Sequence, residues 1–539
     1  MVRHGRRRWV AALLSSALGL FALPFPVLAS APLTNGATLV VSVPGPITGC
    51  SALSPSLNAS SQAVLDLTLP SAFVTSSKDV PRGANGVIAS AELVSLKPMT
   101  VTYTIDPKAH WSDGHPFSTS DLIAWWHKAA EANSVLSAGY RDIISMTPSA
   151  NGSQVVAVFR SPFAPWNTLF RDVEERGVAT ASCALSTLRA RPSLGPYLVA
   201  TASPSSVTLV TNPSWRYSFN RFSRVVVTAS SAIPRVTVPF VAYVAAATKS
   251  SVDDLAKHAL VEGHIGATDS VVELQFAPHR PLTSSVALRS AWSWLLDRKK
   301  LLKTLFGSFT LTPSVAPSLL WGQNQQNAPQ SPRVIETDQT PSTPVYDCLA
   351  CAERLLTQNG FAFSNGSRLT RAGASPLFTV VRGPSAIDAA TAQAVKAQWA
   401  SFGVTVKLSR ASSDQAASFA VAHDHVDVAV IARPMGMSPW FAATSFLGLS
   451  SPDAFATGET VPGERALVGQ ALENFNPVTA TSTWLAIDQM DMSTYLVRPL
   501  FTPPSLTELS PAITNEAISL SLLGLVDQVT TWGVAPTVK

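Results

Sequence analysis

The sequence predicts an α/β protein built from more than one lobe. Segments with the two-residue period of strands alternate with segments of helical period along most of the chain, which is typical of lobes made from a sheet and covering helices. At 539 residues the chain exceeds what one hydrophobic core usually holds, so at least two lobes are expected. Hydrophobic residues make up 46% and charged residues 14% of the chain, which excludes general disorder.

The charge distribution argues against a nucleic-acid partner. The net charge is +5, and four of the positive charges come from Arg3, Arg6, Arg7 and Arg8. The remainder of the chain is therefore almost neutral, whereas nucleic-acid-binding domains carry a clear basic excess.

Residues 1–29 have the composition of a signal peptide. A basic start is followed by a short apolar run from Val10 to Leu23 and by the small-residue cleavage pattern Val27-Leu28-Ala29. An uncleaved membrane anchor is the alternative. No later run approaches the roughly 20 apolar residues of a membrane span, so we expect an exported protein, periplasmic or extracellular and associated with the cell envelope.

The first half of the chain is expected to be rich in strands. Residues 101–106 alternate apolar and polar side chains, the turn Trp111-Ser112-Asp113-Gly114 follows, and Ser118 with Asp121 marks the start of a helix. The other strands expected here are 37–43, 154–159, 197–200, 206–211, 224–228, 240–246 and 271–276, and helices are expected within 62–73 and at 252–260.

The second half is expected to alternate helices and strands. Residues 285–306 have helical periodicity throughout and are expected to form a single helix that ends at Gly307. The helices expected after it are 351–359, 385–402 and 463–474, and the strands are 377–381, 403–408, 426–432 and 496–501.

Four local motifs follow one another in an order that resembles a known family. They are the segment around Trp111-Ser112-Asp113-Gly114, the hairpin from Gly195-Pro196-Tyr197 to Asn212-Pro213-Ser214-Trp215, the helix with Arg289, Ala291 and Leu295-Leu296-Asp297-Arg298, and the unit Trp399 to Val406. Together they resemble the family 5 extracytoplasmic solute-binding proteins, the peptide- and nickel-type receptors of ABC importers. The amino-acid sequence of the first segment also resembles that of an actinobacterial lipoprotein branch of this fold, which is associated with envelope glycolipid assembly.

The resemblance implies a two-lobed, periplasmic-binding-protein-like fold of the large type II peptide-binding class, with a ligand cleft between the lobes. Family members cross the hinge twice, and we expect the crossings near Asp269 and Leu496. The first lobe would then comprise residues 30–268 plus 495–539, and the second lobe residues 269–494.

The resemblance also directs attention to the segment after the strand 426–432. In oligopeptide-binding relatives this segment carries an aspartate that pairs with the α-amino group of the peptide. This chain has Arg433 and no acid there, which suits a carboxylate or phosphate ligand, unless Arg433 simply faces solvent. Met435, Trp440 and the more distant Trp321 are expected to line an apolar pocket, with core packing as the alternative.

The four cysteines are expected to form disulfides, since their number is even in an exported chain. Of the three possible connectivities, we expect Cys50 with Cys183 and Cys348 with Cys351. A redox role for the second pair is the alternative, although the strand context of redox motifs is missing. His423-Asp424-His425 is the one histidine cluster, and we expect it to face water and not to bind a metal.

We expect no catalytic site and no cofactor, because the sequence contains no nucleophile elbow, phosphate-binding loop, dinucleotide motif or zinc-protease motif. The function expected is that of a monomeric solute-binding protein that captures a peptide-like or other small solute by hinge closure and delivers it to the transmembrane subunits of an ABC permease. The alternative is a scaffold or regulator of envelope assembly on the same fold.

Overall fold

The structure is a computed structural model that describes residues 36–534 with internal gaps. The residues left out within this range are 55–56, 76–80, 85, 133, 179–184, 218–221, 231–233, 235–237, 248–261, 308–315, 317, 323–347, 365–367, 437, 447–454, 456, 460 and 515–521. The expected signal peptide, the expected helix 252–260 and Cys183 therefore lie outside the described residues.

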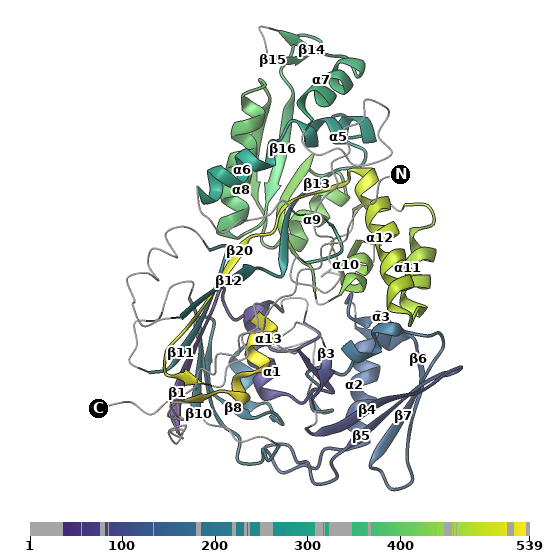
Figure 1. The fold of residues 1–539 in the computed structure, drawn as a ribbon, viewed down its shortest axis with the longest axis vertical. Coiled ribbons are helices and arrows are strands. Elements are labelled where there is room, and N and C mark those ends of the chain that lie inside the picture. Colours follow the sequence, from purple (N-terminus) through teal and green to yellow (C-terminus); the bar gives the residue numbers. More distant parts are fainter. Residues whose placement is uncertain are drawn as a thin grey trace, which may run out of the picture.

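Two sheets, each with its own hydrophobic core, form the two main parts of the molecule (Figure 1). The lower sheet in this view has seven strands in the order β12 (Glu262–Ala267), β20 (Pro504–Leu509), β11 (Phe240–Ala245), β1 (Ala37–Val43), β10 (Phe222–Ala229), β9 (Ser206–Thr211) and β8 (Tyr197–Ser203). The upper sheet has five strands in the order β17 (Thr405–Arg410), β16 (Leu377–Arg382), β18 (Val428–Pro434), β13 (Ser270–Phe276) and β19 (Val497–Phe501). We call the part built on the seven-stranded sheet the first lobe and the part built on the five-stranded sheet the second lobe.

A third sheet extends the first lobe. Its four antiparallel strands are, in order, β4 (Ile88–Leu96), β5 (Met99–Ile105), β7 (Gln154–Phe159) and β6 (Ile143–Pro148). The first lobe also contains α1 (Ala59–Thr68), α2 (Thr119–Glu131), α3 (Ser137–Arg141), α13 (Leu522–Asp527) and the short 3₁₀ helices η1 (Ala164–Thr168), η2 (Leu185–Ala190) and η3 (Val529–Thr531). The two-stranded ribbons β2–β3 (Phe73–Thr75, Pro81–Gly83) and β21–β22 (Ile513–Thr514, Gly533–Val534) complete it.

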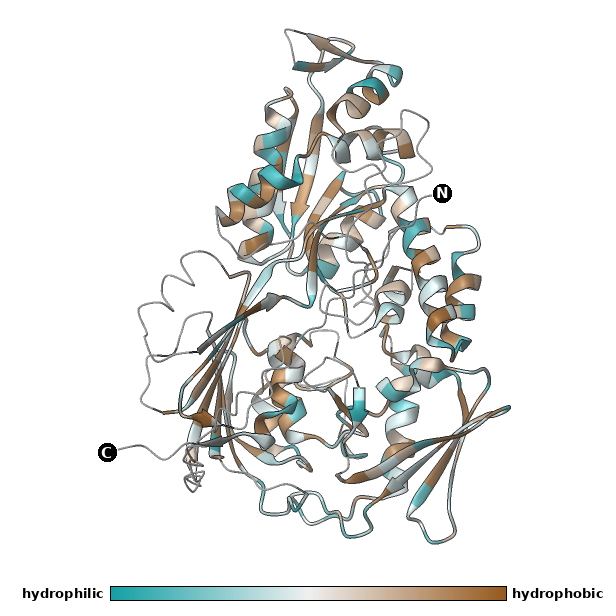
Figure 2. Ribbon diagram, in the orientation of Figure 1, coloured by the Kyte–Doolittle hydropathy of each residue, from teal (hydrophilic) through white to brown (hydrophobic). Residues whose placement is uncertain are grey.

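Helices surround the five-stranded sheet of the second lobe. They are α5 (Val286–Trp294), α6 (Arg298–Phe306), α7 (Leu349–Gln358), α8 (Ala386–Ala400), α9 (Asp414–Ala422), α10 (Pro439–Phe446), α11 (Glu464–Glu473) and α12 (Pro477–Thr494), and the ribbon β14–β15 (Phe361–Ser364, Arg368–Arg371) lies at the far end. In Figure 2 these helices carry both hydrophobic and hydrophilic residues, as expected for helices with one packed face. Among the described residues, no helix combines the length and the apolar character that crossing a membrane requires.

The turn and the helix start expected around residue 114 are confirmed. Gly114 adopts a φ of 92°, its N–H donates to the carbonyl of Trp111 at 2.9 Å, and Trp111 itself is buried. The backbone N–H of Ser118 donates to Asp121 Oδ2 at 2.8 Å, so the acid closes the first turn of α2. This segment is part of the scaffold of the first lobe.

The single helix expected over residues 285–306 is wrong, because the structure has two helices there. Helix α5 ends at Trp294, and α6 begins at Arg298. Asp297 is the N-cap of α6, and its side chain accepts the backbone N–H of Lys300 at 2.8 Å. An aspartate in extended backbone conformation starts a new helix here despite continuous helical periodicity.

Strand pairing locates the two crossings between the lobes. The first lies between β12 and β13 at residues 268–269, and the second lies between β19 and β20 at residues 502–503. Because β19 pairs with β13, residues 497–501 belong to the sheet of the second lobe. We therefore propose a lobe boundary after residue 501 in place of the one expected at 494/495, and we retain the boundary after residue 268.

Candidate functional site

The two crossings are short and lie side by side. The backbone N–H of Thr268 in the first donates to the carbonyl of Pro503 in the second at 2.9 Å. Each crossing contributes two residues between strands of different sheets. A small rotation at these two positions changes the angle between the lobes, which is the geometry of a two-stranded hinge.

Both sheets present the carboxyl ends of their parallel strands to this hinge. In the second lobe, Ser270 at the start of β13 pairs with Pro434 at the end of β18, and β16 and β17 run parallel to β18. In the first lobe, Ala267 at the end of β12 pairs with Pro504, β11 is antiparallel to β20, and β1 and β10 run parallel to β11. Ligands of open α/β sheets bind outside the carboxyl ends of the strands, so we regard these two facing edges as the candidate binding site.

The edge of the first lobe is held by the start of α1. After β1 the chain turns, and the backbone N–H groups of Thr48 and Gly49 both donate to the hydroxyl of Ser61 at 2.9 Å. Ser61 in turn donates to Asn58, the N-cap residue of α1, at 2.7 Å. The loop that faces the second lobe is therefore fixed by a helix N-terminus.

Two arginines lie at the edge of the second lobe. Arg382 ends β16, Arg410 ends β17, and the two residues are direct partners in the parallel ladder. Arg410 is exposed and Arg382 is partly exposed. Arg382 Nη1 donates to the carbonyl of Gly383 at 2.9 Å, and Arg410 Nη2 approaches the carbonyl of Pro384 at 3.4 Å. Both side chains are thus held near the carboxyl ends of their strands and remain at least partly accessible to solvent.

A buried pair of carboxyl groups lies beside these arginines. Asp388 lies in the first turn of α8 and Asp414 in the first turn of α9, and the two side chains are adjacent. Each carboxyl group has one buried oxygen with no hydrogen-bond donor among the described residues. A single proton shared between the two groups would satisfy both oxygens. Burial, followed by the charge of Asp388, raises the pKa of Asp414 to about 8.

Gly383 separates the end of β16 from this acid pair, and it tolerates no side chain. A Cβ at residue 383 would collide with the carboxylates of both Asp414 and Asp388. We expect Gly383→Ala to lower the free energy of unfolding by about 1–3 kcal/mol, as overpacking does, measured by chemical denaturation. Gly469→Ala in α11 is the matched control, because no atom lies within 4 Å of the added methyl group. The control should gain stability, and equal effects of the two substitutions would contradict the close approach.

The four residues expected to bind ligand are packed in the interior behind this edge. Arg433 has no exposed surface, Met435 is also fully buried, and Trp321 and Trp440 are only 3% and 5% exposed. Met435 packs against Val271 and Ala316. These apolar side chains are therefore buried and do not line an open pocket.

Arg433 makes a buried ion pair. Its Nε lies 3.0 Å from both carboxylate oxygens of Glu273, and its Nη2 donates to the carbonyl of Leu319 at 2.8 Å. The guanidinium carbon lies 4.3 Å from the ring centroid of Phe446. Burial raises the pKa of the Glu273 carboxyl, and the charge of Arg433 opposes this rise. Arg433 thus joins β13, β18, α10 and the segment 318–321, and its charge is already neutralised.

Trp440 and Trp321 belong to a cluster that contacts the first lobe. Helices α10, α11 and α12 with residues 318–321 enclose this cluster, which we call the α10–α12 block. The ring of Trp440 packs edge-to-face on Phe163 of the first lobe, with centroids 5.9 Å apart. Leu136 and Ala138 of the first lobe also pack against the block. The lobes therefore touch at a second place besides the hinge, as Figure 1 shows for α11 above α3.

The cysteines and the histidine cluster noted in the sequence do not take part in the candidate binding site. Cys348 and Cys351 form a disulfide at the start of α7. Cys50 is disulfide-bonded as well. Asp424 accepts hydrogen bonds from the backbone and ring of His279, while the ring of His423 stacks on Phe419. Among the described residues, no three His, Cys, Asp or Glu side chains are arranged to hold a metal ion.

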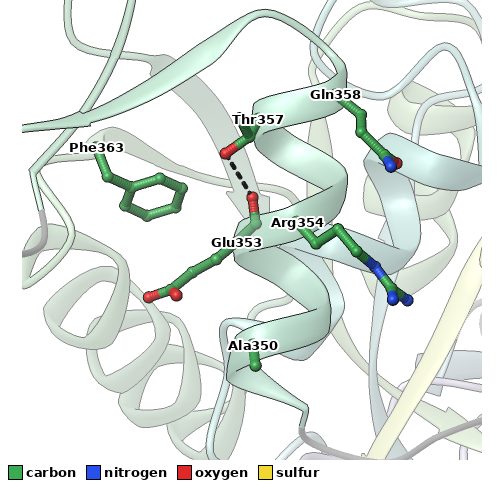
Figure 3. Close-up of a pocket in the computed structure, with 6 residues that line it drawn as sticks. All are labelled: Ala350, Glu353, Arg354, Thr357, Gln358 and Phe363. Carbon is green, nitrogen blue, oxygen red and sulfur yellow. Dashed lines mark hydrogen bonds between the residues drawn. The ribbon is translucent and has the colours of Figure 1, made fainter. Parts of the chain in front are cut away.

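An open hollow on the outer end of the second lobe is remote from the edge. Figure 3 shows its lining residues, which come from α7 and β14: Ala350, Glu353, Arg354, Thr357, Gln358 and Phe363. Glu353 and Arg354 point in different directions there, and the one hydrogen bond drawn joins Thr357 to the backbone of Glu353. The side chains do not converge on a common point, so the hollow does not resemble a binding site.

Comparison with known proteins decides the family. Residues 85–452, more than half of the chain, match the model of the bacterial extracellular solute-binding proteins, family 5. The chain belongs to this family. The similarity to a periplasmic EDTA-binding protein, EppA, has a TM-score of 0.80 over 94% of this chain and 98% of that one, at 21% identity. The expected two-lobed type II fold is thereby confirmed.

Two curated relatives of this family member match over shorter stretches. The oligopeptide-binding protein OppA of Mycobacterium tuberculosis is 29% identical over 173 residues, which is 29% of each chain. The probable monoacyl phosphatidylinositol tetramannoside-binding protein LpqW of the same species is 33% identical over 118 residues, which is 21% of this chain and 19% of that protein. The alignments span less than a third of either relative's length.

Proposed function

We propose that the protein captures a small solute, such as a peptide or another small anionic molecule, between the two facing edges and hands it to an ABC permease. The observation that carries this proposal is the pair of hydrogen-bonded crossings with the carboxyl ends of both sheets directed toward each other. Membership of a solute-binding family supports it. We expect no chemical change of the solute.

Closure about the crossings would perform the capture. Rotation at residues 268–269 and 502–503 brings the loop after β1 toward the ends of β16 and β17. A solute shifts the lobes toward the closed form only by the amount that it binds this form more tightly than the open form. Opening would separate Trp440 from Phe163, so this aromatic contact would stabilise the closed form.

The charges exposed at the edge favour a ligand with an anionic group. Arg433 is neutralised by Glu273 and buried, whereas Arg382 and Arg410 are accessible. Guanidinium groups bind carboxylates and phosphates in bidentate fashion. We therefore propose that Arg382 and Arg410, in place of Arg433, bind the anionic group of the ligand.

Native mass spectrometry of the purified full chain, followed by identification of any co-purified molecule, tests this function. The double variant Arg382→Gln/Arg410→Gln should weaken binding of that molecule at least about tenfold, which corresponds to the loss of one charge-assisted contact. Arg354→Gln at the outer hollow is the matched control and should bind as the parent does. Binding that is unaffected by the double variant would contradict the anion assignment. Solution scattering unchanged by the ligand would contradict hinge closure.

A second candidate is a scaffold or regulator of envelope assembly on the same fold, and the local match to LpqW favours it. This role needs neither a bound solute nor a permease. Genes for envelope synthesis next to this one, together with a protein that purifies empty and keeps the same shape in solution with every solute tested, would favour it. A neighbouring pair of permease genes would favour transport.

A further inference from the structure

A narrow cavity inside the second lobe is lined by two acidic side chains. It lies between α10, α11, α12 and the start of β19, away from the edge that faces the first lobe, and has room for about one water-sized sphere. The polar residues of its lining are Glu464, Asp491, Thr457 and Thr494. The other lining residues are Leu319, Phe446, Val461, Leu496 and Val497.

Both carboxylates are buried without a full set of partners. Glu464 is 3% exposed and Asp491 is 8% exposed. Glu464 Oε1 and Asp491 Oδ2 have no hydrogen-bond partner among the described residues. Buried polar atoms in folded proteins are nearly always satisfied by protein, water or a bound ion. A cation or a hydrogen-bond donor held in the cavity would satisfy both oxygens.

The hydroxyl groups of Thr457 and Thr494 can act only as acceptors toward the cavity. Thr457 donates its proton to the carbonyl of Glu459 at 3.0 Å, and Thr494 donates its proton to the carbonyl of Asp491 at 2.7 Å. A hydroxyl group has a single proton, so neither can donate to the carboxylates. The polar side chains of the lining are therefore oxygen acceptors, which suit a bound cation, and the backbone of Val461 hydrogen-bonds to the carboxylate of Glu464.

Among the described residues, no cation forms an ion pair with Glu464 or Asp491, although the charges of Arg465 and Arg433 partly oppose the rise in the pKa of Glu464 and of Asp491, respectively. Arg433 on β18 is paired with Glu273 on β13, and Arg289 on α5 donates to the carbonyls of Thr494 and Thr283 and lies 3.8 Å from Glu459. Asp488, one turn earlier on α12, accepts three donors from residues 318–320 and adds further negative charge. Arg465 is the remaining cation near Glu464. Burial raises the pKa of both acids, and the charge of Glu464 raises that of Asp491 further.

We propose that this cavity binds one dehydrated monovalent cation, sodium, potassium or ammonium, through Glu464 and Asp491. Magnesium fits less well, because it needs a near-ideal octahedron of ligands. Among the described residues, no group of three acidic, histidine or cysteine side chains is arranged for such an ion. The cation would join α11 to α12 next to β19, which leads into the second crossing. The proposal does not depend on which solute the protein carries.

Thermal unfolding of the full chain in different salts tests the proposal. The measurement is made at about pH 8, well above the usual range of carboxyl pKa values, because a cation is attracted only by ionised acids. The melting temperature in potassium, sodium or ammonium chloride should exceed that in choline chloride of equal ionic strength by a few degrees. Asp491→Asn and Glu464→Gln should abolish this difference. Both variants keep the shape of the side chain and remove a repelling buried charge, so they should melt above the parent in choline.

The pH dependence provides a further check, with its sign fixed by the raised pKa values. A buried acid with a raised pKa contributes stability below its unfolded pKa and loses it as the pH rises through the folded pKa. In choline the parent should therefore lose stability as the pH rises, and a bound cation should offset that loss. Asp414→Asn, which alters the other buried acid pair, is the matched control and should retain the full salt response.

Equal melting temperatures of the parent in all the chlorides would overturn the proposal. The same salt response in Asp491→Asn as in the parent would also overturn it, because the response would then arise elsewhere. A response to calcium with none to the monovalent ions would overturn the assignment of a monovalent site.

Discussion

Arg433→Met is expected to lower the free energy of unfolding by about 3–5 kcal/mol, the usual cost of leaving a buried charge without its partner. The substitution leaves Glu273 without its ion-pair partner, and the carboxylate of Glu273 is fully buried, 3.0 Å from Arg433 Nε. It also removes the donor to the carbonyl of Leu319. Chemical denaturation of the parent and the variant measures the difference.

The double variant Glu273→Leu/Arg433→Met is the control for this ion pair. Replacing both members with apolar groups removes the unpaired buried charge and should recover most of the lost free energy of unfolding. Recovery should be incomplete by about 1–3 kcal/mol, because the carbonyl of Leu319 and the amide of Gln275 lose partners. If Arg433→Met were as stable as the parent but lost its ligand, Arg433 would be a ligand residue after all, as the sequence had suggested.

Arg171→Met is expected to have an effect of similar size in the first lobe. Arg171 is the cation among three nearly buried acids: its Nη2 lies 2.7 Å from Asp66 and 3.1 Å from Asp527, and its Nε lies 3.6 Å from Asp172. These contacts join α1, the loop at 170–172 and helix α13 near the end of the described chain. Without the guanidinium group, three carboxylates repel one another in the interior, at a cost of about 3–5 kcal/mol or more.

The pH dependence of the Arg171→Met variant distinguishes repulsion from lost packing. Burial raises the pKa of Asp172 to about 6, from an unfolded value of about 4, and raises that of Asp66 well above its usual range. Stability from such groups is present below about pH 4 and declines as the pH rises through about 6. The stability deficit of Arg171→Met should therefore shrink near about pH 5, because protonation relieves the repulsion. Asp527→Asn, which keeps the pair with Asp66, should cost much less. A deficit of equal size at all pH values would show that packing, not charge, is responsible.

Local signals in the sequence predicted most of the sheet strands and several helix starts. The strand at 99–105, the turn at Gly114 and the capping of α2 by Asp121 all depend on residues within a few positions of one another. The break at Asp297 also has a local cause, but helical periodicity on both sides obscured it. Helix α12 was not recognised, because threonines occur throughout its first half and blur the apolar pattern.

The location of the candidate site was predictable only in part. The order of four motifs implied a two-lobed family member and a first crossing close to residue 269, next to the observed connection at 268–269. The pairing of Arg382 with Arg410 was not recognised, because both residues lie just beyond the predicted strands 377–381 and 403–408. Two parallel strands become neighbours only after the intervening helix packs, so the chain order does not reveal which side chains meet.

The sequence by itself determined the family, the α/β class and the local turns and caps, because these depend on short-range backbone chemistry and on patterns that recur in relatives. The tertiary structure decided the role of charged residues. Arg433 suits an anionic ligand as a residue type, but Glu273, 160 positions earlier, occupies its guanidinium group. Likewise, Glu464 and Asp491 are unremarkable in sequence and meet only where α11 packs on α12. Electrostatic function depends on burial and on distance in space, and neither is fixed until the lobes have folded.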